Sequence, residues 1–251
     1  MSGRSHQPPL GGSVANSIAF IVRCQNSTMG RGSQEGMRMT RIILVRHGET
    51  EWNRVERFRG RADVPLNERG LLQAEATARG IESRSVVAAV YSSPLSRAVR
   101  TAQAIAERQS LSVQIHQGLV DIDYGEWQGL SVEEVRRRRP ELLAAWYQAP
   151  HIVRIPGGES LDELRARCGA TVKEIATRHS GSAVVLVAHT VVNRIILLFV
   201  LGLDNGRFWH LRQDTCAMNE IEVDGEEFTL VSMNDTCHLH SSGAEKATTG
   251  G

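Results

Sequence analysis

The amino-acid sequence predicts an α/β fold, a three-layer α/β/α sandwich around a mostly parallel sheet with an antiparallel edge. Two observations carry this prediction. Short, apolar, β-branched runs recur along the chain, as expected of strands buried on both faces, and segments of helical periodicity separate them. Near the end of the chain, two further strand signals flank Asp224-Gly225, a dipeptide typical of a hairpin turn.

The elements follow one another in the order that such a sandwich requires. The predicted strands are 41–45, 86–91, a weaker 113–116, 183–188, 217–223 and 228–233. The predicted helices are 67–81, 94–109, 160–179 and 191–201. Ser93-Pro94 predicts a helix start, with the serine as cap and the proline in the first turn. The apolar run 195–203 is shorter than the ~20 residues of a membrane span, so we expect a buried helix there.

Composition divides the chain into three parts. Residues 1–38 hold six glycines, many serines and no sustained period, which predicts a disordered or mis-started N-terminal extension. A transit peptide is the alternative, because the first acidic residue is Glu35. Residues 39–237 are expected to form the folded domain. The Ser/Thr/Gly-rich stretch 238–251 is expected to be a disordered tail.

Charge and cysteine content exclude several classes of protein. The 29 basic and 28 acidic residues nearly balance, which argues against nucleic acid or a membrane surface as the main partner. None of the four cysteines forms a CxxC pair or has zinc-ligand spacing. Free thiols and a cytoplasmic location are therefore expected, with no metal and no cofactor. The sequence makes no prediction of the oligomeric state.

Chemically competent residues follow three of the predicted strands. Arg46 and His47 follow the first strand, Arg97 lies just beyond the second, and His189 follows the fourth. Because ligands bind beyond the carboxyl ends of parallel strands, these side chains are expected to converge. Guanidinium groups bind phosphate oxygens, and Asn53 adds an amide donor. Neighbouring cations should keep His47 neutral, and a neutral imidazole beside phosphorus is a nucleophile.

A leaving oxygen also needs a proton, and the segment DIDYGEWQG offers Asp121, Asp123 and Glu126 as donors. No carboxylate cluster of the kind that binds Mg²⁺ stands at the predicted strand ends, so metal-independent chemistry is expected. The pattern as a whole predicts phosphoryl transfer from a small phosphorylated substrate.

Six segments in order give the chain a family resemblance: RHGETEWN, GRADVPLNERG, YSSPLSRAVRTA, DIDYGEWQG, PGGES and VAHTVVNR. They resemble the histidine phosphatase superfamily, in its phosphoglycerate mutase-like branch with the RHG signature. The resemblance runs from Arg41 to Val231, about three quarters of the chain. An RHG tripeptide alone would carry little weight, whereas six motifs in sequence are specific.

The resemblance implies a role for each matching residue. His47 would be the phosphorylated histidine, and the phosphoryl oxygens would be held by Arg46, Arg97, His189 and Asn53. Further substrate contacts are expected from Arg59, Gly60 and Thr190. Asp121 stands four residues before Gly125, where the family usually has its glutamate acid, so Asp121 is preferred over Glu126 as proton donor. Arg59 and Arg100 replace a frequent glutamine, which favours a more acidic substrate.

Three functions compete: a phosphomonoesterase, a phosphoglycerate mutase and a non-catalytic phosphate-binding protein. Every residue that the chemistry needs has a competent occupant, which disfavours the last. Pro156 follows Asp121 by only 35 residues, and the mutases of the family generally carry a larger insert there. Hydrolysis is therefore expected. The leaving-group pocket is expected within 126–156, where α-ribazole phosphate, phosphoglycerates, sugar phosphates and nucleotides all remain candidate substrates. The remaining histidines, including His179 and His238, are expected at the surface.

Overall fold

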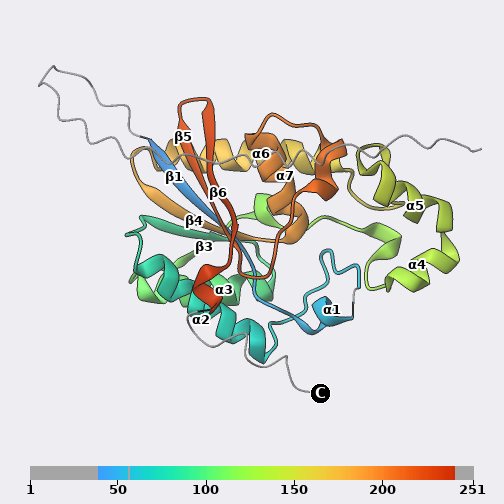
Figure 1. Ribbon diagram of the computed structural model, residues 1–251, viewed down its shortest axis with the longest axis horizontal. Helices are drawn as coiled ribbons and strands as arrows, with labels where there is room; N and C mark the ends of the chain where they lie inside the picture. Colours follow the sequence, from blue (N-terminus) through green and yellow to red (C-terminus); the bar gives the residue numbers. More distant parts are fainter. Residues whose placement is uncertain (1–38, 56, 241–251) are drawn as a thin grey trace, which may run out of the picture. The chain divides into compact units, whose positions relative to one another are not determined.

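The computed structural model describes residues 39–55 and 57–240 (Figure 1). The predictions for 1–38 and 241–251 lie outside the described residues. The strands are β1 Thr40–Arg46, β2 Ala89–Ser92, β3 Val113–Ile115, β4 Ala183–Ala188, β5 Met218–Asp224 and β6 Glu227–Asp235. The helices are α1 Glu51–Arg54, α2 Glu68–Glu82, α3 Ser96–Arg108, α4 Val132–Arg138, α5 Pro140–Gln148, α6 Leu161–Arg178, α7 Thr190–Val200 and α8 Cys237–His240. A 3₁₀ segment, η4, covers Asn205–His210.

The sheet has the order β3-β2-β4-β1-β5-β6. Strand β1 pairs in parallel with β4 and antiparallel with β5, and β2 pairs in parallel with both β3 and β4. Strand β6 pairs antiparallel with β5. The predicted fold class is confirmed. The order makes β2, β4 and β1 adjacent, so the residues after these three strands meet at one edge of the sheet.

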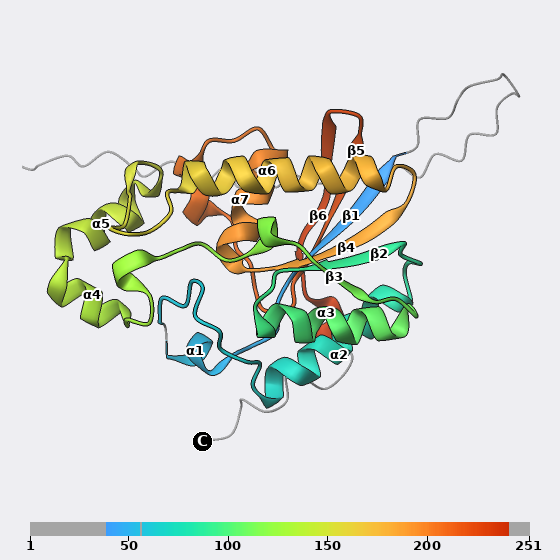
Figure 2. The same ribbon diagram turned by 180° about the vertical axis from the view of Figure 1, so that it is seen from behind.

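Side chains of β1 alternate between the two cores on either side of the sheet. Ile42 and Leu44 belong to the core that includes residues of α6 and α7, whereas Ile43 and Val45 belong to the core that includes residues of α2 and α3. Figures 1 and 2 show these helix pairs on opposite faces of the sheet, with α4 and α5 beyond its edge. Because successive residues of a strand point to opposite faces, an uninterrupted apolar run is needed to fill both cores.

Two predicted boundaries are displaced: the start of the helix after Ser93-Pro94 by two residues, and the hairpin turn at Asp224-Gly225 by one. Helix α3 begins at Ser96 with Leu95 as its cap, so the prediction of Ser93 as cap was wrong. The Ser93 hydroxyl instead contacts His189, at 2.7 Å between Oγ and Nε2, a tertiary contact that local sequence does not reveal. In the hairpin, Asp224 still pairs with Glu227, so the turn consists of Gly225 and Glu226.

The structure continues past the expected end of the folded domain at residue 237. Helix α8 follows β6, and both His238 and Leu239 are buried. The His238 ring contacts the Thr77 hydroxyl of α2, at 3.0 Å between Nε2 and Oγ1. The prediction of a surface position was therefore wrong for His238. His179 is only half-buried, and its Nε2 lies 2.8 Å from the Tyr91 hydroxyl. A four-residue helix has too little periodicity to be recognised in sequence.

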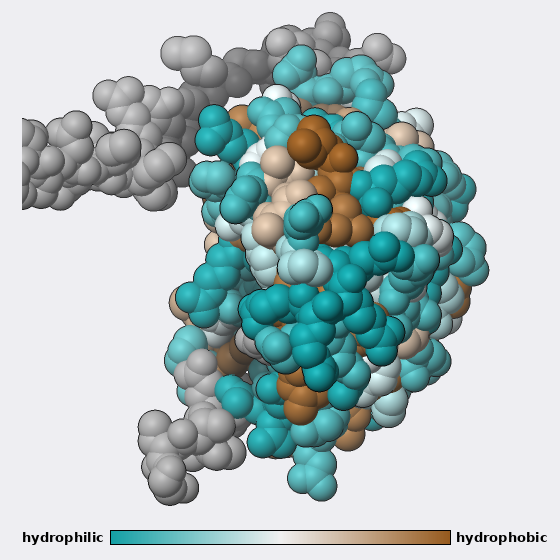
Figure 3. All heavy atoms as spheres, turned by 90° about the vertical axis from the view of Figure 1, so that its right-hand side faces the viewer, coloured by the Kyte–Doolittle hydropathy of each residue, from teal (hydrophilic) through white to brown (hydrophobic). Residues whose placement is uncertain are grey.

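One end of the molecule presents a surface of mixed polarity. Figure 3 faces the end formed by α4 and α5, where hydrophilic residues form a band and apolar residues gather in separate patches. Within the described part of the chain, no helix has both the length and the apolar character needed to cross a membrane. The apolar run after Arg194 lies mostly in α7, a helix with eight buried residues, as predicted.

Candidate active site

A cleft of about 420 Å³ opens beside the carboxyl edge of the sheet. Six of the predicted site residues line it: Arg46, Asn53, Arg59, Gly60, Asp121 and Thr190. The other three, His47, Arg97 and His189, are fully buried and do not themselves line it. Asp121, which lines the cleft, contacts both Arg97 and His189, and the His189 ring in turn lies 5.1 Å from the His47 ring, centroid to centroid. The structure therefore brings all nine predicted residues into one region.

The hydrogen bond of the His47 ring fixes its tautomer. Nδ1 lies 2.6 Å from the backbone carbonyl oxygen of Gly48. A carbonyl oxygen only accepts hydrogen bonds, so Nδ1 must carry the proton and donate it. Nε2 then holds the lone pair, and it has no hydrogen-bond partner among the described residues. The ring is thus oriented with an unprotonated nitrogen available for attack.

The charge state of His47 supports the same role. Burial, followed by the positive charges of Arg97 and Arg46, holds the pKa of His47 well below its usual range near 6.5. The imidazole is therefore neutral at physiological pH and keeps its lone pair. Burial also lowers the pKa of Arg46 to about 9, helped by the neighbouring guanidinium groups of Arg59 and Arg194. Arg46 remains charged at neutral pH, but an anion between these groups would relieve their repulsion.

His189 approaches His47 from the neighbouring strand, with ring centroids 5.1 Å apart. The Ser93 hydroxyl, from the end of β2, contacts Nε2 of His189 at 2.7 Å. A hydroxyl that donates to Nε2 places the ring proton on Nδ1, which lies 3.7 Å from Oδ2 of Asp121. Burial and the nearby arginines keep the pKa of His189 well below its usual range. His189 can therefore act as a neutral donor toward an oxygen placed between it and Asp121.

Asp121 contacts two buried groups, the guanidinium group of Arg97 and the imidazole of His189. Its Oδ2 is 3.3 Å from Nη2 of Arg97, and its Oδ1 accepts a hydrogen bond of 3.0 Å from the backbone N–H of Ile122. The charges of the neighbouring arginines alone would depress the pKa of Asp121. The opposite holds: burial raises the pKa of Asp121 by more than Arg97 and Arg59 lower it. Desolvation of a carboxylate that is 5% exposed outweighs the attraction of its neighbours.

Glu126, the alternative proton donor, lies elsewhere. Its exposed carboxylate pairs with Arg139 at 3.2 Å and lines a separate hollow beside α4. Because Gly125 begins a 3₁₀ turn between the two acids, their side chains leave the backbone in different surroundings. Of the two acids, only Asp121 lines the cleft and touches Arg97.

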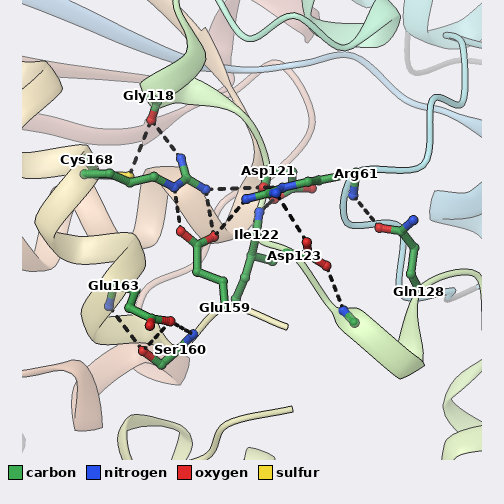
Figure 4. A network of polar contacts seen from close by, with 12 residues as sticks. Arg61, Gly118, Asp121, Ile122, Asp123, Gln128, Glu159, Ser160, Glu163 and Cys168 are labelled. Atoms are coloured by element: carbon green, nitrogen blue, oxygen red, sulfur yellow. Dashed lines mark hydrogen bonds and ion pairs between the residues drawn. The ribbon is translucent and has the colours of Figure 1, made fainter. Parts of the chain in front are cut away.

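A polar network fixes the loop that carries Asp121 (Figure 4). Arg167 of α6 donates to the carbonyl oxygens of Gly118 and Asp121, at 2.8 and 3.3 Å, and pairs with Glu159 at 2.7 Å. Arg61 pairs with Asp123 at 3.2 Å and with Glu159 at 3.7 Å. The backbone of the loop is thus clamped from both sides, which leaves the Asp121 carboxylate little freedom to move.

Two glycines bring the loop after β1 against α2. A Cβ on Gly70 would lie 2.1 Å from the carbonyl oxygen of Glu49, and one on Gly48 would lie 2.5 Å from the carbonyl oxygen of Gly70. The Gly48 N–H also donates to the Thr101 hydroxyl at 3.1 Å. Backbone atoms cannot move aside as a flexible side chain can. The glycines of the RHG and NERG segments are therefore required by close backbone approach.

We expect Gly70→Ala to lower the free energy of unfolding by about 1–3 kcal/mol, the usual cost of forcing extra atoms into a packed site. Urea denaturation measures this change. Leu72→Ala, at an exposed position of the same helix, is the control and should change stability by no more than about 0.5 kcal/mol. Equal stability of Gly70→Ala and the parent protein would contradict the proposed backbone contact.

Several cleft residues were missed by the sequence reasoning. They come mainly from α7 and from the region between α7 and β5: Arg194, Phe208, Trp209, Arg212, Gln213 and Asp214. From the predicted pocket region, 126–156, only Val132 and Tyr147 line the cleft. That prediction was therefore wrong in its main part. Arg194 closes the VAHTVVNR segment and could have been found, since it stands one helical turn after Thr190.

The other residues predicted to contact the substrate are Asn53, Gly60 and Thr190. Oδ1 of Asn53 accepts hydrogen bonds of 2.9 Å from the backbone N–H and the hydroxyl of Thr50, so its amide N–H₂ is left to donate. Gly60, at a positive φ of 50°, accepts from Arg97 through its carbonyl oxygen at 2.8 Å. The Thr190 hydroxyl is buried and has no hydrogen-bond partner among the described residues.

Unsatisfied polar atoms concentrate at this site. Of the buried side-chain atoms that lack a hydrogen-bond partner in the described part of the chain, half belong to the site: Nε of Arg46, Arg59 and Arg97, Nε2 of His47, Nδ1 of His189 and Oγ1 of Thr190. Buried polar atoms normally have partners, so such a gathering indicates a binding site. Three guanidinium groups face one carboxylate, and the excess positive charge fits a phosphoryl group. No group of metal-binding side chains is found among the described residues.

Comparison with known proteins gives a consistent picture. The family model of the histidine phosphatase superfamily (branch 1) matches residues 42–236. The chain is 39% identical to phosphoserine phosphatase 1 of Hydrogenobacter thermophilus, over 80% of this chain and 95% of that protein. It is 35% identical to a metal-independent phosphoserine phosphatase of Arabidopsis thaliana, over 82% of this chain and 85% of that one. The solved structure of Bacillus stearothermophilus YhfR superposes with a TM-score of 0.76 at 30% identity, covering 80% of this chain and 99% of that one.

Proposed function

The chain belongs to the histidine phosphatase superfamily and, with its phosphoserine phosphatase relatives, is a phosphomonoesterase of small phosphorylated metabolites; we propose that it works through a phosphohistidine on His47. The observation that carries this proposal is the His47 tautomer. Its Nδ1–H is held by the Gly48 carbonyl, while Nε2 is unprotonated and without a partner among the described residues. This is the state that a nucleophilic imidazole requires.

In the first half-reaction, the Nε2 lone pair of His47 attacks phosphorus and forms the P–N bond while the P–O bond to the leaving group breaks. Asp121 transfers its proton to the departing oxygen. Arg46, Arg97 and His189 hold the phosphoryl oxygens and neutralise the charge that spreads over them. Asn53 and Thr190 add neutral donors, and Arg59 extends the positive field into the cleft.

In the second half-reaction, water attacks the phosphohistidine from the side that the leaving group vacated. Asp121, now a carboxylate, takes a proton from this water as the new P–O bond forms. The P–N bond breaks, its electron pair returns to Nε2, and inorganic phosphate leaves. His47 and Asp121 are then back in their starting protonation states, so atoms and charge balance over the cycle.

Both curated relatives described above are named phosphoserine phosphatases, so we propose phosphoserine as the first ester to test. A panel should also contain 3-phosphoglycerate, a sugar phosphate, a nucleotide and nitrophenyl phosphate, each assayed by phosphate release in excess chelator. Hydrolysis of at least one natural ester in chelator is expected. Absence of phosphate release from every member, or activity that depends on added Mg²⁺, would contradict the proposal.

Hydrolysis is expected to dominate over mutase transfer. Since 126–156 contributes only Val132 and Tyr147 to the cleft, little of that segment covers the cleft through which water would reach a phosphoryl group on His47. Given 3-phosphoglycerate and a bisphosphoglycerate primer, the enzyme should release phosphate faster than it forms 2-phosphoglycerate. Both products can be followed together by ³¹P NMR. Faster formation of 2-phosphoglycerate would instead support the mutase.

A further inference from the structure

Arg194 differs from the other arginines that line the cleft. Arg57 pairs with Glu134 at 3.3 Å, and Arg212 pairs with Asp214 at 2.9 Å, so both charges are already neutralised. Arg46 and Arg59 carry unpartnered buried nitrogens of the phosphoryl site. Arg194 forms no ion pair with any residue in the described ranges, yet it lines the cleft.

The Arg194 side chain is held in a fixed position. Its guanidinium carbon lies 5.0 Å from the ring centroid of Phe208 and 5.0 Å from that of Trp209. Its Nε donates to the carbonyl oxygen of Leu211 at 2.7 Å. The stem and one nitrogen are thus occupied, whereas no hydrogen bond within the described residues involves its two terminal nitrogens. These two nitrogens form the planar fork that binds a carboxylate in a bidentate manner.

The position of Arg194 relates it to the phosphoryl site. Thr190, next to His189, lies one helical turn before Arg194, so the two side chains stand on one face of α7 about 6 Å apart along its axis. The charge of Arg194 is close enough to lower the pKa of Arg46. A second anionic group on the substrate would therefore meet Arg194 at a separation that a short carbon chain spans.

We propose that Arg194 binds a carboxylate on the leaving group, so that the enzyme prefers phosphate esters of small hydroxy acids to esters of uncharged alcohols. The proposal rests on the phosphatase function given above and adds the substrate class. A carboxylate would use the free fork of Arg194 while the phosphoryl group lies against Arg46 and Arg59. Phe208 and Trp209 would exclude water from this contact and strengthen it.

Two substrate pairs that differ at the carboxylate test the proposal. Phosphoserine is compared with phosphoethanolamine, and 3-phosphoglycerate with glycerol 3-phosphate, by kcat/KM for phosphate release. The parent enzyme should prefer the acid in at least one pair. A hydrogen-bonded ion pair of this kind typically contributes about 10–100-fold, so Arg194→Met should lower that preference by about this factor. Arg194→Lys, which keeps the charge without the fork, should restore part of it.

Arg165→Met is the matched control. Arg165 also lies over an aromatic ring, 5.7 Å from the Phe199 centroid, and donates to the carbonyl oxygen of Leu203 at 2.8 Å, but it does not line the cleft. It should leave the acid preference unchanged. A purely structural role of Arg194 predicts that Arg194→Met slows both members of each pair equally, and this result would overturn the proposal. No acid preference in the parent enzyme, or an equal change in Arg165→Met, would also overturn it.

Binding distinguishes failure of this proposal from failure of the phosphatase function. In a His47→Ala background, calorimetric titration with the same pairs scores carboxylate recognition without turnover. The acid should bind more tightly than its partner, and Arg194→Met should remove the difference. If the parent hydrolyses no ester but this difference is present, the phosphatase function fails and carboxylate recognition stands. If esters are hydrolysed and the difference is absent, recognition by Arg194 fails alone.

Discussion

Replacing His47 by alanine is expected to lower kcat by at least about 10⁴-fold, the scale of loss when a covalent nucleophile is removed. The fold should survive, because β1 and the Gly48–Gly70 contact do not depend on the imidazole. Steady-state phosphate release measures the loss, and circular dichroism checks the fold. His151→Ala, at an exposed position outside the cleft, is the control and should keep parental activity.

The same variant tests the covalent intermediate. A rapid quench of the parent enzyme with ³²P-labelled substrate should trap acid-labile, base-stable label, as expected of phosphohistidine. Label should be absent from His47→Ala and present in His151→Ala. Label found on a serine or an aspartate would contradict the mechanism, and label retained by His47→Ala on another histidine would move the nucleophile to that residue.

Replacing Asp121 by asparagine should produce a leaving-group-dependent loss. An alkyl phosphate expels a basic alkoxide and needs the proton of Asp121, whereas nitrophenyl phosphate expels a stable phenolate and needs it little. General acid catalysis typically contributes about 10²–10⁴-fold, so phosphoenzyme formation should slow by that factor for the alkyl ester and by much less for the nitrophenyl ester. Single-turnover measurement is required, because the later attack by water uses Asp121 as well.

The pH dependence follows from the pKa directions of both groups. Asp121 must be protonated, so activity on the alkyl ester should fall as pH rises through its pKa, which burial raises. His47 must be neutral, so protonation of His47 should lower activity only at acidic pH, below its lowered pKa. Asp121→Asn should remove the fall in activity with rising pH for the alkyl ester. Glu126→Gln is the control: leaving-group dependence in that variant instead would identify Glu126 as the acid.

Local sequence patterns were sufficient for the sheet and for the convergence at its edge. The buried strand Ala183–Ala188 was predicted at its observed bounds because an uninterrupted β-branched run between helical segments has few alternatives. His47 and His189 could be placed because parallel strands end on one edge, so sequence order and fold class together bring their ends to one side. The Ser93 contact with His189 could not be predicted, since the same serine is an equally good helix cap.

Properties that depend on burial were not available from the sequence. The direction of the Asp121 pKa shift is set by how much solvent the whole fold removes from one carboxylate, and neighbouring charges alone would give the wrong sign. The cleft wall around Arg194 was missed for a related reason. In the sequence, Phe208 and Trp209 are ordinary apolar residues. Only in the fold does the 3₁₀ segment η4 pack on α7 and place both rings against the guanidinium group of Arg194.

The two sides of the cleft are built from different kinds of structure, and this has an evolutionary consequence. The phosphoryl side rests on the ends of β1, β2 and β4 in the middle of the sheet, where any shift would disturb both cores. The opposite wall draws on α5, η4 and the segment before β5, which can exchange side chains without moving a central strand. Selection can therefore alter which alcohol is released while the apparatus that breaks the ester bond is inherited unchanged.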